Sequence, residues 1–172
     1  MADSSDDVRA QIAALLPRLR RFGRALARTQ EDDDDVVQIA IEKALMRTGQ
    51  WTPGTRLDSW MFRIMQNVWI DEVRARERRG RIFVPEEEAQ HVGASPTDAQ
   101  IDAIAVRKAV AQLNDDQRAV VGLVLVEGLA YQEAAEVLGI PVGTLTSRLA
   151  RARDALQRLL GETAANTKEG AA

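Results

Sequence analysis

The side chains best suited to bind a ligand lie near the C-terminus, where hydroxyl and guanidinium groups recur at helical spacing. They are Thr144, Ser147, Arg148, Arg151 and Arg153. Leucines and alanines between them recur every three or four positions, which predicts a helix whose polar residues face outward. A short helical segment and a turn ending at Pro141 come directly before it. This order is typical of a helix-turn-helix, whose second helix contacts bases in the DNA major groove.

A second basic cluster lies in the middle of the chain, at the end of an apolar and aromatic stretch. It consists of Arg74, Arg76, Arg78 and Arg79. Arginines in this arrangement can follow a nucleic-acid backbone while nearby aromatic side chains stack on unpaired bases. For both clusters the alternative is an ordinary helix with a solvated basic face, and the pattern alone leaves both interpretations open.

Several kinds of catalytic site are excluded by composition. The chain has no Cys and one His, His91, so thiolate zinc sites, catalytic thiols and His-based triads are not expected. The aspartates at 32–35 are consecutive, so on a helix they point in different directions, unlike the alternating ligands of a calcium loop. We therefore expect no metal, no cofactor, no small-molecule substrate and no enzymatic activity.

Composition and the positions of Gly and Pro predict an all-α protein of two small helical domains. Aromatic residues make up 4% of the chain, and the net charge is −3. The expected domains are 8–79 and 98–160, joined by an acidic linker at 80–97 that contains Gly and Pro. The small, polar tail at 161–172 is expected to be disordered. No apolar run is long enough to span a membrane and no secretory signal is present, which predicts a cytoplasmic protein without membrane insertion.

The N-terminal domain is expected to contain three helices, at 8–28, 31–46 and 57–79, with a loop at 48–56. Pro17 is expected to kink or split the first helix. The second helix carries an outward stripe at spacings of three, four and seven, with one apolar member: Asp35, Gln38, Ile39 and Glu42. A polar stripe with one exposed apolar residue suits a protein interface better than a core.

The C-terminal domain is expected to contain four helices, at 98–113, 115–127, 130–138 and 141–160. Asn114 is a cap for the second of these, which is rich in Val and Leu. Gly139 ends the third and Pro141 begins the fourth.

Three motifs occur in the order and spacing of a known family. They are EDDDDVVQ at 31–38, WMFRIMQN at 60–67 followed by DEVR at 71–74, and VGTLTSRLARAR at 142–153. Together they resemble the extracytoplasmic-function (ECF) sigma factors of bacterial RNA polymerase, the minimal sigma-70 type with domains two and four only. Residues 16–20, 53–55 and 116–118 are further similar to the alphaproteobacterial general-stress-response branch.

The resemblance implies roles for both basic clusters in promoter recognition. Domain four of the family contacts the minus-35 element through its helix-turn-helix, which assigns Thr144, Ser147, Arg148, Arg151 and Arg153. Domain two recognises the minus-10 element as single-stranded DNA, with a base flipped into a pocket of the loop that is here 48–56. This assigns Trp51, Asn67, Arg74, Arg76, Arg78 and Arg79. Trp51 could equally be a side chain that fills the core, and Asn67 could instead make a structural hydrogen bond.

The resemblance also implies protein partners. Domain two binds the clamp helices of the largest subunit of core RNA polymerase, which assigns the stripe Asp35, Gln38, Ile39 and Glu42, and the flap is a further expected contact. A regulatory anti-sigma factor is expected to hold the two domains together, with the apolar segment 115–127 among its contacts.

Two other functions compete with an alternative sigma factor. A sigma mimic keeps the fold but binds an anti-sigma factor in place of DNA, and it would not need the arginines near the C-terminus. A stand-alone helix-turn-helix regulator would account for residues 98–160 only and would leave the N-terminal domain without a role.

Overall fold

The computed structural model describes residues 3–80 and 97–169, with side chains for 7–80 and 97–162. Every regular element in these ranges is helical, which confirms the all-α prediction. Most of the expected linker, residues 81–96, lies outside the described residues, as do residues 170–172 of the expected tail.

Three long helices form the N-terminal domain, as predicted. They are α1 (Asp3–Leu26), α2 (Gln30–Met46) and α3 (Leu57–Arg78), with the short 3₁₀ helix η1 (Thr48–Gln50) in the loop between the last two. Thr29 caps α2, because its hydroxyl accepts a hydrogen bond from the Asp32 N–H. The three helices pack through fully buried apolar side chains, which include Leu19, Phe22, Met61, Phe62 and Met65.

Pro17 was expected to kink or split the first helix, and the helix is not split. The helix continues through Pro17 to Leu26. Proline costs a helix one hydrogen bond and some steric strain. Apolar residues on both sides of it, such as Ile12 and Leu19, are buried in the same core, so packing of the whole helix outweighs that cost.

The C-terminal domain contains α4 (Asp98–Gln112), α5 (Asp115–Val121), the π-helical turn η2 (Gly122–Val126), α6 (Tyr131–Leu138) and α7 (Val142–Glu169). Thr97 and Asn114 form capping boxes at the starts of α4 and α5. The segment 115–127, expected as one α-helix, changes to π geometry at Gly122.

The prediction of a disordered tail is wrong for residues 161–169, because α7 continues to Glu169. Extending an existing helix adds one hydrogen bond for each residue that is fixed, so an alanine-containing segment without proline continues a helix already nucleated.

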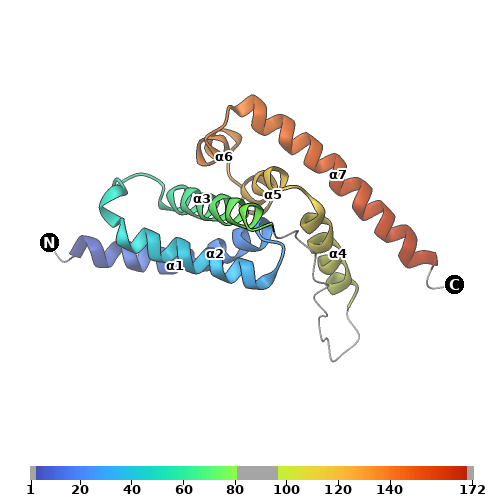
Figure 1. The fold of residues 1–172 in the computed structure, drawn as a ribbon, viewed down its shortest axis with the longest axis horizontal. Helices are drawn as coiled ribbons and strands as arrows, with labels where there is room; N and C mark the ends of the chain where they lie inside the picture. Colours follow the sequence, from blue (N-terminus) through green and yellow to red (C-terminus); the bar gives the residue numbers. More distant parts are fainter. Residues whose placement is uncertain (1–2, 81–96, 170–172) are drawn as a thin grey trace.

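The two domains are docked, a point on which the sequence gives no information. In Figure 1, α5 and α6 lie beside α3, and the start of α1 and the end of α7 lie at opposite ends of the long axis. One apolar core includes Phe22 and Phe62 from the N-terminal domain together with Val120, Leu123 and Ala135 from the C-terminal domain. Gly122 permits this contact, because an added Cβ would lie 2.8 Å from the Phe22 ring.

A buried carboxylate at the start of α2 makes stability depend on pH. The Asp33 side chain lies against Gly23 of α1, where an added Cβ would be 2.1 Å from Asp33 Oδ1, an oxygen without a hydrogen-bond partner among the described residues. Burial raises the pKa of Asp33 to about 6, despite the attraction of Arg24. The folded state therefore binds a proton more tightly than the unfolded state, so this group stabilises the fold at low pH and costs stability as pH rises through about 6.

Asp33→Asn is expected to raise the free energy of unfolding at pH 7 by about 1–2 kcal/mol, because the amide carries no charge to bury. The gain should shrink as pH falls below about 6 and vanish only below about 3.8, the ordinary pKa, where Asp33 is protonated in the unfolded protein as well. Urea denaturation at several pH values measures this difference, with Glu31→Gln, an exposed position in the same turn, as the control. An equal gain at pH 7 and pH 4.5 would contradict the assignment.

Candidate nucleic-acid interface and the domain contact

The C-terminal end of the fold has the geometry of a helix-turn-helix. Gly139 ends α6 with φ of 64°, a left-handed conformation that glycine adopts without strain. The Ile140 N–H donates to the Ala135 carbonyl at 3.1 Å, which closes the turn before α7. Leu145 and Leu149 are buried, as the pattern predicted, so α7 turns its opposite face to solvent.

The five predicted minus-35 residues lie on or beside this outer face. Ser147, Arg151 and Arg153 are exposed, and Thr144 and Arg148 are half-buried. The Ser147 hydroxyl donates to the Gly143 carbonyl at 2.9 Å, which orients the oxygen as an acceptor. Four of the five line a single pocket of about 390 Å³; Arg153 does not.

Residues from the start of α5 complete this pocket and were missed as functional residues in the sequence. They are Asn114, Asp116 and Gln117. Asp116 Oδ2 lies 3.2 Å from Arg148 Nη2, an ion pair between the two helices. In the sequence, Asn114 marks the start of a helix, but a cap does not indicate which other helix packs against that start.

The second basic cluster divides into exposed and ion-paired arginines. Arg74 and Arg78 are exposed on α3. Arg76 is ion-paired with the buried Asp32 of α2 and, at 3.0 Å, with Glu72. Burial opposes ionisation of Asp32, yet the hydrogen bonds from Arg76 hold its pKa below the usual range. Arg79 Nη2 lies 3.4 Å from Glu72. Arg76 therefore joins α3 to α2 in this structure.

The two other predicted minus-10 residues have different surroundings. Trp51 is half-buried against the core, and its Nε1 is buried without a hydrogen-bond partner in the part of the chain that the structure describes. Asn67 is exposed. The structural hydrogen bond considered for Asn67 was expected on the buried side of α3, whereas the helix turns this position to solvent.

The predicted protein-binding stripe on α2 is solvent-facing over its whole length. Asp35, Gln38, Ile39 and Glu42 are all exposed, and Gln38 donates to Glu42 at 3.2 Å. Ile39 is 38% exposed. The stripe continues into two apolar residues not predicted as part of it, Leu45 (38% exposed) and Met46 (85% exposed).

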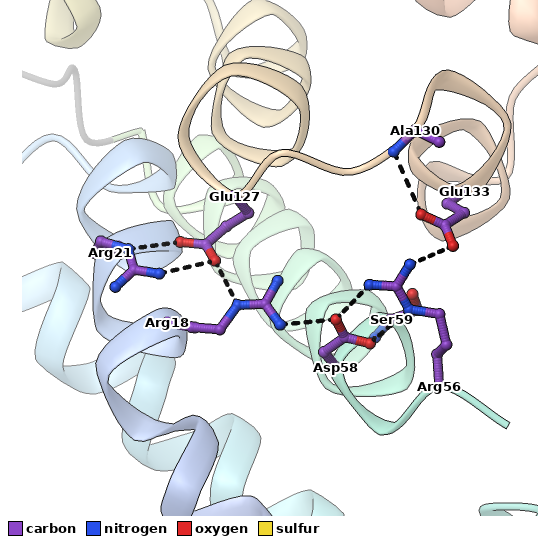
Figure 2. Close-up of polar contacts among 8 residues, drawn as sticks. All are labelled: Arg18, Arg21, Arg56, Asp58, Ser59, Glu127, Ala130 and Glu133. Carbon is purple, nitrogen blue, oxygen red and sulfur yellow. Dashed lines mark hydrogen bonds and ion pairs between the residues drawn. The ribbon is translucent and has the colours of Figure 1, made fainter. Parts of the chain in front are cut away.

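A chain of ion pairs crosses the contact between the domains (Figure 2). The Glu127 side chain, just after η2, is fully buried and accepts from Arg18 Nε at 2.9 Å and Arg21 Nε at 3.1 Å. Arg18 also binds Asp58 at 2.8 Å. Burial alone would raise the pKa of Asp58, but hydrogen bonds from two arginines lower it to about 2.

The chain of ion pairs continues into the helix-turn-helix. Arg56, the residue before α3, binds Asp58 at 2.7 Å and reaches across to Glu133 of α6. Glu133 also accepts from the Ala130 N–H at 3.3 Å, so one carboxylate caps α6 and joins it to the N-terminal domain (Figure 2).

Arg118 is a fully buried cation at the same contact. Its Nε donates to the Leu26 carbonyl of α1 at 2.8 Å, and its guanidinium also binds the Leu113 carbonyl and Asp115. Asp115 in turn accepts from Trp69 Nε1 at 3.3 Å. Burial lowers the pKa of Arg118 to about 10, which still leaves it charged at pH 7.

Within the described ranges, no group of three or more His, Cys, Asp or Glu side chains is arranged to hold a metal ion. Among the same residues, no helix combines the length and apolar character needed to cross a bilayer.

Comparison with known proteins places both domains in the sigma-70 class. Residues 12–66 match the family described as the Sigma2 domain of PhyR, and residues 103–156 match Sigma-70, region 4. The fold resembles the sigma factor RpoE of Bartonella quintana, solved in complex with the anti-sigma factor NepR, with a TM-score of 0.78 and 30% identity over 90% of this chain and 97% of that one.

Curated relatives define the family more narrowly. The chain is 33% identical to the ECF RNA polymerase sigma factor EcfG of Rhodopseudomonas palustris, over 91% of this chain and 86% of the relative. It is 37% identical to the ECF sigma factor SigM of Mycobacterium tuberculosis, over 84% and 72%. The chain belongs to the ECF sigma factors, and it is an alternative sigma factor. These relatives are sigma factors, a class that is not enzymatic.

Proposed function

We propose that this chain binds core RNA polymerase through α2 and contacts promoter DNA through both domains, without catalysing a reaction itself. The observation that carries the proposal is the helix-turn-helix of α6 and α7. Its solvent-facing side gathers two hydroxyls and two arginines around one pocket: Thr144, Ser147, Arg148 and Arg151. Hydroxyls near the start of a recognition helix and guanidiniums further along suit base edges and phosphates of the major groove.

The minus-10 contact is assigned to the exposed members of the second cluster. Arg74, Arg78 and Asn67 are accessible to a strand lying along α3. Arg76 and Arg79 contribute only if their ion pairs with Asp32 and Glu72 rearrange. Trp51 is half-buried, so stacking on a flipped base requires its outer edge to be used.

The contact with polymerase is assigned to the α2 stripe. Asp35, Gln38, Ile39 and Glu42 offer polar groups and one apolar side chain on a single exposed face. Leu45 and Met46 extend this face with two exposed apolar side chains. Exposed apolar side chains that continue a polar stripe favour a protein partner over a solvated surface. We assign the flap of the polymerase to the C-terminal domain as a second contact.

An anti-sigma factor is the proposed regulator, acting in the cytoplasm. The apolar segment 115–127 was expected to contact it, but Val120, Val121 and Leu123 are buried in the protein itself. Leu125 and Val126 remain exposed at η2 and are the part of the segment available to a partner. The relative from Bartonella quintana, solved with NepR, supports this proposal.

The docked arrangement bears on how the promoter is reached. The minus-35 and minus-10 elements are, by their names, about 25 base pairs apart, or roughly 85 Å along B-form DNA. Arg56, in the loop assigned to the minus-10 element, is bonded to Glu133 of the helix-turn-helix. We infer that the domains separate on the promoter and that a partner binding both would stabilise the docked form.

Replacing both Arg148 and Arg151 by Ala is expected to weaken binding to minus-35 duplex about tenfold or more. The slope of log Kd against log salt concentration should fall by about one for each phosphate that the variant no longer binds. Fluorescence anisotropy at several salt concentrations measures both quantities. Arg107→Ala, an exposed arginine on α4, is the control and should leave both unchanged. An unaltered slope in the double variant would reject the phosphate contacts.

A further inference from the structure

A carboxylate lies inside the surface assigned to promoter DNA. Asp116, in the first turn of α5, lines the same pocket as Thr144, Ser147, Arg148 and Arg151. Its side chain is 62% exposed, and its Oδ2 is 3.2 Å from Arg148 Nη2. The pocket is accessible in the docked form, so this arrangement faces any DNA that approaches α7.

A carboxylate at this place works against the largest sequence-independent attraction of DNA. Phosphates bind arginines regardless of sequence, and a fixed negative charge a few ångströms away reduces that attraction. The start of a helix favours negative charge, so Asp116 disfavours DNA binding without destabilising α5. An exposed ion pair alone adds little to stability. The position of Asp116 is therefore costly for general DNA affinity, and its pairing with Arg148 gives the fold little in return.

The ion pair also restricts Arg148. A guanidinium has five N–H donors, and its pairing with Asp116 through Nη2 leaves the remaining donors on a fixed plane. Two parallel N–H donors on such a plane match O6 and N7 of guanine. An arginine without this partner is a mobile side chain that binds whichever phosphate is nearest.

We propose that Asp116 is a specificity-determining residue of the minus-35 contact. Its carboxylate holds Arg148 toward a base edge and repels phosphates from the pocket. It thus trades general affinity for discrimination between sequences. This inference rests on the proposed contact of α7 with DNA.

The test uses the full chain and two duplexes of equal length. One is selected from a randomised pool by the wild-type chain, and the other has random sequence. Asp116→Asn should tighten binding to the random duplex by about fivefold, from removal of one nearby repulsive charge. Binding to the selected duplex should tighten less or weaken, so the ratio of the two dissociation constants falls. Asp116→Glu, which keeps the charge, should retain most of the discrimination.

Two controls separate this effect from a change in net charge or in folding. Asp102→Asn, an exposed position on α4 outside the pocket, makes the same charge change and should leave the ratio unaltered. In the Arg148→Ala background, Asp116→Asn should no longer lower the ratio, because the two residues act as a pair. Thermal unfolding of each variant shows whether the fold is retained.

The outcomes are distinct. Equal tightening of both duplexes by Asp116→Asn, the same result from Asp102→Asn, or an unchanged ratio overturns the role of Asp116. A wild-type chain that selects no sequence and binds both duplexes equally overturns instead the proposed contact of α7 with DNA.

Discussion

Arg118→Met is expected to lower the free energy of unfolding by about 3–5 kcal/mol. Arg118 is 0% exposed, and its guanidinium occupies the Leu26 and Leu113 carbonyls and Asp115. Methionine fills a similar volume but donates no hydrogen bond, so two carbonyl oxygens are left without this donor inside the protein. Urea denaturation followed by far-ultraviolet circular dichroism measures the decrease.

Arg107→Met on α4 makes the same chemical change at an exposed position and should alter stability by less than about 0.5 kcal/mol. Asp115→Asn should cost less than Arg118→Met, because the Asp115 side chain is 43% exposed and water can replace part of the interaction that is removed. If Arg118→Met proves as stable as the wild type, the buried position of Arg118 in the docked form is contradicted.

Glu127→Ala is expected to weaken docking of the two domains by about 2–4 kcal/mol. The substitution removes a fully buried carboxylate that binds Arg18 and Arg21 of α1 and leaves those arginines without this partner at the contact. Arg18 keeps Asp58, and Arg21 is 45% exposed, so the N-terminal domain itself should stay folded. The expected result is a population in which the domains lie farther apart.

The chain has no Cys, so a pair of introduced cysteines can be labelled uniquely for single-molecule energy transfer. Ala13 on α1 and Gln157 on α7 are exposed positions, one in each domain. Glu77→Ala is the matched control, the same substitution at an exposed position on α3 that is not part of the chain of ion pairs. A single unchanged distance distribution in Glu127→Ala would show that the chain of ion pairs does not hold the domains together.

Local signals in the sequence predicted most of the elements. The apolar spacing placed the helices of both domains, and Asn114 and Gly139 placed a start and an end that the structure confirms. These signals depend on a residue and its near neighbours along the chain. The outward stripe of α2 and the outer face of α7 were predicted on the same basis, and both face solvent.

The contact between the domains could not be predicted in this way. The apolar segment 115–127 was expected to contact an anti-sigma factor, whereas its Val120 and Leu123 are buried in the common core with Phe22. Arg118 has no local pattern that marks it as buried, because its partners Leu26 and Leu113 act through backbone carbonyls. Burial of a charged residue is decided by the tertiary contact and not by local spacing.

The pocket on the helix-turn-helix likewise combines residues that the sequence predicts with one that only the folded chain reveals. Thr144, Ser147, Arg148 and Arg151 could be assigned from the sequence because one helix carries them all. Asp116 could not, because it comes from α5 and meets Arg148 only in the folded chain.

Run-off transcription with purified core RNA polymerase on a promoter library tests the central claim most directly. With the wild-type chain we expect discrete transcripts whose start sites share a pair of upstream elements, and with the Arg148 and Arg151 double variant we expect these transcripts to disappear. If the wild-type chain, free of any inhibitor, gives core polymerase no start-site selection, the assignment of these surfaces to promoter and polymerase is contradicted.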